Sequence, residues 1–291
     1  MGKLRLRDST TFLFLIAPSF IVLFALTLIP LLQSGYNGMF QWNMAMPDAK
    51  RFVGFGNYIY MASDKYFWNA LFNTVVQVGG TVILQLIIGM PLALLLSRSF
   101  VGIRALRTIY MLPMMLTPIV VGLTWRMLLN PELGVLNYYL SKIGIMAPDW
   151  LGNPHTAMLS IILTDVWLST PFVTMILLAG IQSLPHEPYE SAKLDGASYL
   201  QQFRYLTLPL LQPVILVAVL FRLMDAVKRF DTIYVMTGGG PGNKTETLNL
   251  FAYDQAFRFL NTGYAAALSN VMFLLIIVLS AYLLRKIQTQ D

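Results

Sequence analysis

The sequence has no cysteine and only two histidines among its 291 residues. The lack of cysteine excludes disulfides, thiol nucleophiles and thiolate metal ligands. His155 and His186 are far apart in the chain, so a histidine metal site is not expected either. The basic residues behind the net charge of +6 form no dense stripe, which argues against a nucleic-acid partner.

Charge as a whole is scarce, at 12% of residues, whereas 56% are hydrophobic and the mean hydropathy is +0.63. These values exceed what a soluble core requires. Apolar runs of about 20 residues, enough to cross a bilayer, recur along the chain. The sequence therefore predicts an all-α membrane protein with six transmembrane helices, over residues 12–32, 71–96, 108–129, 157–181, 210–236 and 264–284.

The distribution of lysine and arginine between short loops predicts the orientation. With the N-terminus inside, ten basic residues fall on the cytoplasmic side and six outside, and both termini are cytoplasmic. No signal-peptide cleavage site is evident, so the first span is expected to remain as an anchor. We expect an N-terminal helix with an outer interfacial segment over 1–70, and a core of five helices over 71–291.

One polar stretch interrupts the apolar runs, and we call residues 182–209 the coupling segment. Pro188 suits the first turn of a helix, and Gly196 suits the left-handed residue that ends one. Ser198 with Gln201 forms a capping box that begins another helix. Such short helices need support, either from the rest of the chain or from a groove in a partner.

Charges also lie within the expected spans, where they are costly and tend to be functional. Asp165 lies in the fourth span, and Arg222, Asp225 and Arg229 share one face of the fifth. This pattern has two interpretations. The charges either pair only with one another, or they line a transport route.

The coupling segment resembles the EAA signature of the membrane subunits of bacterial ABC importers. The matching residues are Glu190, Ala192 and Gly196, followed after nine residues by LTLP at 206–209. Ser191 stands where the family usually has alanine, and Leu206 where it often has isoleucine. FVGFGNY, DVWLSTPF and TGGGPGN resemble the sugar-importing branch, that of the maltose and glycerol-phosphate permeases.

This resemblance covers nearly the whole chain and implies the type I, MetI-like permease fold. It implies a non-enzymatic subunit in the plasma (inner) membrane of a prokaryote that moves a di- or oligosaccharide, or a related polyol, into the cytoplasm. The implied partners are a sister permease, two ATPase subunits and an extracytoplasmic sugar-binding protein. This chain would bind no cofactor, because ATP and magnesium belong to the ATPase. The residues implied to couple to it are Glu190, Ala192, Lys193, Asp195 and Gly196.

The resemblance also implies a substrate pathway. Carboxylates can accept hydrogen bonds from sugar hydroxyls, arginines can donate in forks, and an aromatic ring can cover an apolar sugar face. The charged residues leave neutral, acidic and phosphate-bearing substrates open. The implied contact positions are Asp165, Leu168, Ser169, Phe172, Arg222, Asp225, Ala226 and Arg229.

Two other classes compete with this interpretation. A secondary transporter driven by an ion gradient would often show internal repeats related across the membrane, and none is evident. A membrane enzyme would need a nucleophile with its base, or a metal-ligand set, and the sequence offers neither.

Overall fold

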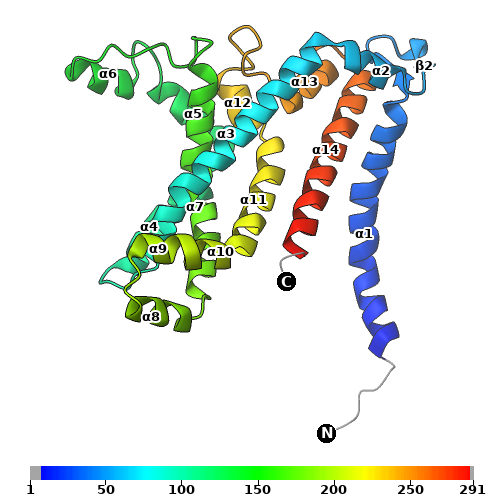
Figure 1. Ribbon diagram of the computed structural model, residues 1–291. Helices are drawn as coiled ribbons and strands as arrows, with labels where there is room; N and C mark the ends of the chain where they lie inside the picture. The colour runs from blue at the N-terminus through cyan, green and yellow to red at the C-terminus, as the bar shows by residue number, and fades with distance from the viewer. Residues whose placement is uncertain (1–7, 289–291) are drawn as a thin grey trace. The chain divides into compact units, whose positions relative to one another are not determined.

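The computed structural model describes residues 8–288 (Figure 1). In this part of the chain, four helices are long and apolar enough to span a membrane, and the number is up to six if each of two bent helix pairs counts as one span. The expected all-α fold is therefore confirmed. The four long helices are α1 (Asp8–Asn37), α3 (Lys65–Leu96), α7 (Ala157–Gln182) and α14 (Thr262–Gln288).

The third span differs from the expected single helix over 108–129. It consists of α4 (Ile103–Met111), a 3-10 turn η2 (Leu112–Met115) and α5 (Pro118–Leu128), and the pair is bent by 92°. Proline lacks a backbone N–H and forces the preceding residue out of the helical conformation. Thr117, just before Pro118, is accordingly extended, with φ −69° and ψ 136°.

The fifth span, expected over 210–236, is also broken. A bend of 64° separates Tyr199–Leu210 from α11 (Gln212–Val227), and the chain leaves the helix at Lys228. Pro213, in the first turn of α11, cannot donate to the preceding turn. Residues expected to finish this span form the separate helix α12 (Asp231–Met236).

The coupling segment has the expected order of helix, glycine break and helix. Helix α8 (Glu187–Leu194) begins with a proline in its first turn, and Gly196 has φ +77°. The Ser198–Gln201 capping box is present at the start of α9 (Tyr199–Gln202). Beyond it lie a π-helical turn η3 (Phe203–Thr207) and α10 (Leu208–Leu210).

The chain divides into two compact units, and the first joins the N-terminal residues up to Ser63 with Ala252–Val271. Backbone hydrogen bonds connect these segments, from Met44 N to Leu260 O (2.8 Å) and from Gly263 N to Trp42 O (3.0 Å). The expected domain boundary near residue 70 does not assign Ala252–Val271 to the N-terminal unit, and it stays a prediction. The short elements of this unit are β1 (Phe40–Gln41), η1 (Pro47–Ala49), antiparallel β2 (Arg51–Phe52), α2 (Gly56–Ser63) and η4 (Asp254–Arg258).

The second unit spans Asp64–Phe251 and Met272 onward, and α3 and α7 pack along each other in it (Figure 1). Glycine allows this close approach, since a Cβ on Gly89 would lie 3.3 Å from side-chain atoms of Val173 and Thr174. Helices α8 to α10 lie near one end of α3, α7 and α11, and α12 lies near the other. The remaining elements are α6 (Val135–Lys142) and α13 (Leu248–Tyr253), and the boundary between the units falls within α13, after Phe251.

Candidate functional site

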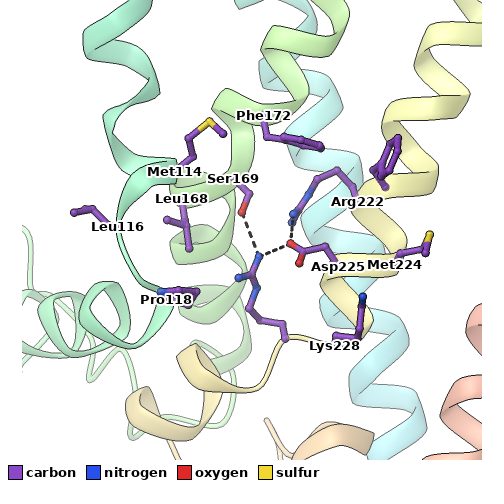
Figure 2. Close-up of a pocket in the computed structure, with 12 residues that line it drawn as sticks. Met114, Leu116, Pro118, Leu168, Ser169, Phe172, Arg222, Met224, Asp225 and Lys228 are labelled. Atoms are coloured by element: carbon purple, nitrogen blue, oxygen red, sulfur yellow. Dashed lines mark hydrogen bonds and ion pairs between the residues drawn. The ribbon is translucent and has the colours of Figure 1, made fainter. Parts of the chain in front are cut away.

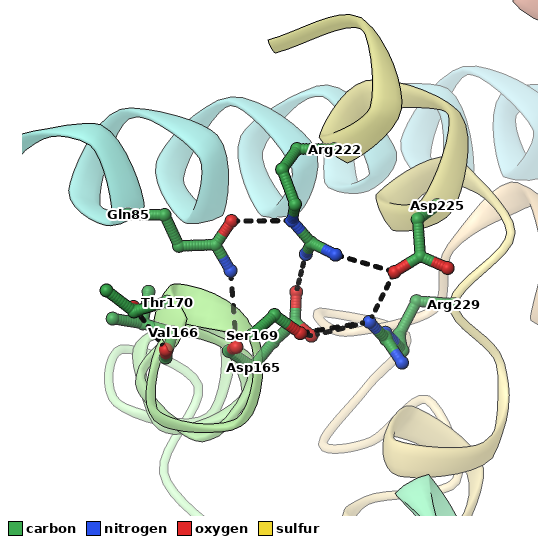
Figure 3. A network of polar contacts seen from close by, with 8 residues as sticks. All are labelled: Gln85, Asp165, Val166, Ser169, Thr170, Arg222, Asp225 and Arg229. Carbon is green, nitrogen blue, oxygen red and sulfur yellow. Dashed lines mark hydrogen bonds and ion pairs between the residues drawn. The ribbon is translucent and has the colours of Figure 1, made fainter. Parts of the chain in front are cut away.

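Four charged side chains from α7, α11 and the residues just after α11 meet in the second unit, and we call Asp165, Arg222, Asp225 and Arg229 the ion cluster (Figure 3). Asp165, whose side chain is wholly buried, lies 3.2 Å from Arg222 and 3.0 Å from Arg229. Asp225 pairs with the same two arginines, at 2.6 and 2.8 Å, but its side chain is 55% exposed. The two carboxylates therefore differ sharply in solvation.

Arg222 uses all three of its guanidinium nitrogens. Its Nη atoms donate to Asp225 and Asp165, and its Nε donates to Gln85 Oε1 over 2.7 Å. Gln85 in turn donates to the backbone carbonyl of Asp165 over 3.2 Å. With its side chain only 3% exposed, Arg222 is fixed by protein contacts on three helices.

Arg229 is less fully engaged. One Nη donates to Asp225 over 2.8 Å and to the Ser169 hydroxyl over 3.3 Å, and the same nitrogen makes the ion pair with Asp165. Its Nε is buried and has no hydrogen-bond partner among the described residues. Arg229 thus retains donor capacity that Arg222 does not.

A pocket of about 430 Å³ opens beside the ion cluster (Figure 2). The bend between α4 and α5 supplies one side of it, and α7 and α11 supply the others. The rings of Phe172 and Phe221 meet edge to face there, 6.4 Å apart. The lining residues are Met114, Leu116, Pro118, Leu168, Ser169, Phe172, Phe221, Arg222, Met224, Asp225, Lys228 and Arg229.

Six of the eight residues expected in a substrate pathway line this pocket. The two exceptions are Asp165, which lies behind the arginines, and Ala226, which is only 1% exposed. The charges pair with one another, and three of the four also line this pocket, so pairing does not exclude contact with a ligand; that they line a transport route stays a prediction.

Sequence reasoning missed Gln85 and Phe221, and it counted Lys228 among the charges of the fifth span without placing it in the substrate pathway. A signal for Gln85 exists, since Asn73, Gln77 and Gln85 lie at multiples of four along α3 and are all buried. A polar stripe at helical spacing within an apolar span indicates a protein-facing side. No comparable pattern marks Phe221.

The coupling segment contrasts with the pocket in its exposure. Helix α8 has no buried residue, Leu194 is 90% exposed, and Glu190 is exposed as well. Within the segment, the Tyr189 hydroxyl on α8 donates to Thr207 Oγ1 on η3 over 3.0 Å. The five expected coupling residues, Glu190, Ala192, Lys193, Asp195 and Gly196, are therefore contiguous on a projecting turn and helix.

Comparison with known proteins identifies the family. Residues 85–291 match the family model described as the binding-protein-dependent transport system inner membrane component. The chain belongs to this family. It is thus an inner-membrane permease subunit of an ABC importer, a transport component and not an enzyme, as the EAA-like motif predicted. Nothing in the comparisons supports a transporter driven by an ion gradient.

Relatives match over nearly their full length. The trehalose/maltose transport system permease protein MalF of Thermococcus litoralis is 36% identical over 276 residues, 95% of this chain and 93% of that protein. The sulfoquinovosyl glycerol transport system permease protein SmoG of Agrobacterium fabrum is 36% identical over 288 residues, 99% and 94% of the two chains.

Among solved structures, a bacterial ABC transporter involved in the import of the acidic polysaccharide alginate has a similar fold. The TM-score is 0.82 at 22% identity, and the match covers 97% of this chain and 96% of that one. The type I, MetI-like permease fold is confirmed.

Proposed function

We propose that this permease moves a carbohydrate across the membrane into the cytoplasm. The observation that carries the proposal is the pocket itself, whose wall combines two aromatic rings with charged hydrogen-bonding groups beside a buried ion cluster. Rings can cover the apolar faces of a sugar while carboxylate and guanidinium groups bind its hydroxyls. The cargo of the relatives supports this proposal, since both named transport systems carry glycosides.

Within the pocket, Asp225 and Arg229 are the groups with capacity left for substrate. The Asp225 carboxylate is more than half exposed, and Arg229 lines the pocket with all of its side-chain polar contacts among the described residues made by one Nη, so one can accept from and the other donate to a hydroxyl. Leu168, Ser169 and Phe172 complete the wall on α7. Asp165 acts through the arginines, as a positioning residue.

The partners follow from the family's architecture. The pocket wall of one permease is completed by a sister permease, the binding protein delivers substrate on the outer side, and two ATPase copies bind ATP and magnesium. Both termini and the coupling segment face the cytoplasm. There the exposed helix α8 docks on an ATPase, with Glu190 making an ion pair and Gly196 forming the hinge.

Co-purification tests the docking. Glu190→Lys should abolish recovery of the ATPase with the tagged permease, because a like charge would replace one side of the ion pair. Glu187→Lys, one turn earlier on the same exposed helix, is the matched control and should retain the ATPase. Recovery of the ATPase with Glu190→Lys would contradict the docking.

Proteoliposomes containing the purified complex and its binding protein test the transport itself. ATP should drive accumulation of oligosaccharide, and Asp225→Ala should lower the rate without dissociating the complex. Accumulation that ignored ATP and followed an ion gradient would contradict the proposal.

A further inference from the structure

The charges around the pocket do not sum to zero. In the ion cluster, Asp165 and Asp225 balance Arg222 and Arg229, with every arginine contacting both carboxylates. Lys228 also lines the pocket and is exposed. None of the ion pairs among the described residues includes it, and its recorded hydrogen bond, from Asn249, uses its backbone carbonyl. One positive charge is therefore left over.

The position of this charge makes it available to a ligand. Lys228 caps the C-terminal end of α11, directly before Arg229, whose side-chain polar contacts among the described residues are all made by one Nη. The helix C-terminus favours a cation there. Two neighbouring residues thus bring positive charge to the same wall.

An unpaired cation that faces a binding pocket favours an anionic ligand, since a bound ligand would cover the lysine and, if neutral, would bury its charge without a partner. A neutral sugar would leave Lys228 without one. The two Asp side chains repel an anion less than their number suggests, because each is already held by both arginines.

From this geometry we infer that the cargo is an acidic saccharide. It carries one carboxylate, sulfonate or phosphate group, which binds Lys228 and the free side of Arg229 while a ring face lies on Phe172 and Phe221. This inference rests on the proposed function and narrows its substrate class.

Uptake of two labelled oligosaccharide pools of equal length tests it. One pool is neutral, and the other carries uronate, sulfonate or phosphate groups. The complete complex with its own binding protein is reconstituted in proteoliposomes, and the lumen is analysed by mass spectrometry. We expect acidic species to accumulate. Lys228→Gln should reduce their kcat/KM roughly 10-fold, the value of one hydrogen bond to a charged group.

Matched variants show whether a loss of acidic uptake comes from the charge at residue 228. Lys65→Gln, at an exposed lysine that does not line the pocket, should leave uptake unchanged. Lys228→Glu should reduce acidic uptake further than Lys228→Gln. Gel filtration should show an intact complex in all three variants.

The outcomes are distinguishable. Uptake of the neutral pool alone, or acidic uptake that ignores Lys228→Gln, overturns the acidic-cargo inference and leaves carbohydrate import standing. Failure of an intact, ATP-hydrolysing complex to take up either pool overturns the proposed function and the inference together.

Discussion

The ion cluster and the coupling segment are both polar parts of an apolar protein, but they are stabilised in opposite ways. The ion cluster is fixed by contacts among side chains of the chain itself, and Asp165 within it is wholly buried. The coupling segment has backbone devices, a proline start, a glycine turn and a capping box, and its helix α8 has no buried residue. The ion cluster is held by the chain itself, whereas α8 leaves its surface open.

The largest expected effect comes from removing the centre of the ion cluster. Asp165→Ala would leave Arg222 and Arg229 buried with half of their charge partners missing, which costs about 3–5 kcal/mol. We expect loss of folded protein in detergent, measured as monodisperse yield and thermal midpoint.

Asp225→Ala is the control for that experiment, because its carboxylate contacts the same arginines but is 55% exposed. It should reduce stability less while impairing transport. Equal stability of wild type and Asp165→Ala would contradict the view that Asp165 positions the arginines.

Gly196→Val should produce the opposite result, with normal folding and defective coupling. A side chain added at Gly196, where φ is +77°, would have free space, but the backbone would be strained. Strain of about 1–2 kcal/mol changes an equilibrium between two conformations by a factor of roughly 5–30. In this variant, substrate-stimulated ATPase activity should fall, while the yield of folded protein and the thermal midpoint should remain unchanged.

The same substitution at Gly102 provides a matched control, since that glycine also has a positive φ, of +90°, and free space. It precedes α4 and lies outside the coupling segment. If both variants reduce coupling equally, backbone strain in general is responsible and Gly196 has no special role as a hinge.

The difference between the two regions also explains what the sequence could predict. Pro188, Gly196 and Ser198 act through their immediate neighbours, so local rules located both helices and the break between them. The ion cluster depends on a contact from α11 to α7 across 57 residues of chain. Spacing along one helix showed that Arg222 and Asp225 share a face, but not that Asp165 would bind both arginines.

The bent spans show the same limit. Hydropathy counted 108–129 as one crossing, although Pro113 and Pro118 lie within it. The 92° bend shapes the pocket, because Met114, Leu116 and Pro118 at the bend line it. Hydropathy averages over such a break, since apolar residues continue through it.

Gln85 offers a finer test of the ion cluster. Gln85→Leu would keep the volume but leave Arg222 Nε without its acceptor, at a cost of about 1–3 kcal/mol. Gln77→Leu, two turns earlier on α3, is the matched control, because Gln77 is equally buried and its Nε2 has no partner among the described residues. The thermal midpoint should fall for Gln85→Leu and change little for Gln77→Leu.

Ser198→Ala should have the smallest effect, and it separates local from partner-dependent stability. The serine hydroxyl accepts from Gln201 N over 3.3 Å, and loss of such a cap costs about 1 kcal/mol. In the isolated permease this should barely alter the thermal midpoint, because so little packs on α9. Hydrogen exchange over 198–202 should instead accelerate about fivefold.

Ser191→Ala, an exposed serine inside α8 that caps nothing, controls for loss of a hydroxyl. Binding of the ATPase should suppress the difference in exchange if the partner holds this segment, and a difference that persists in the complex would mean that the chain alone determines its structure.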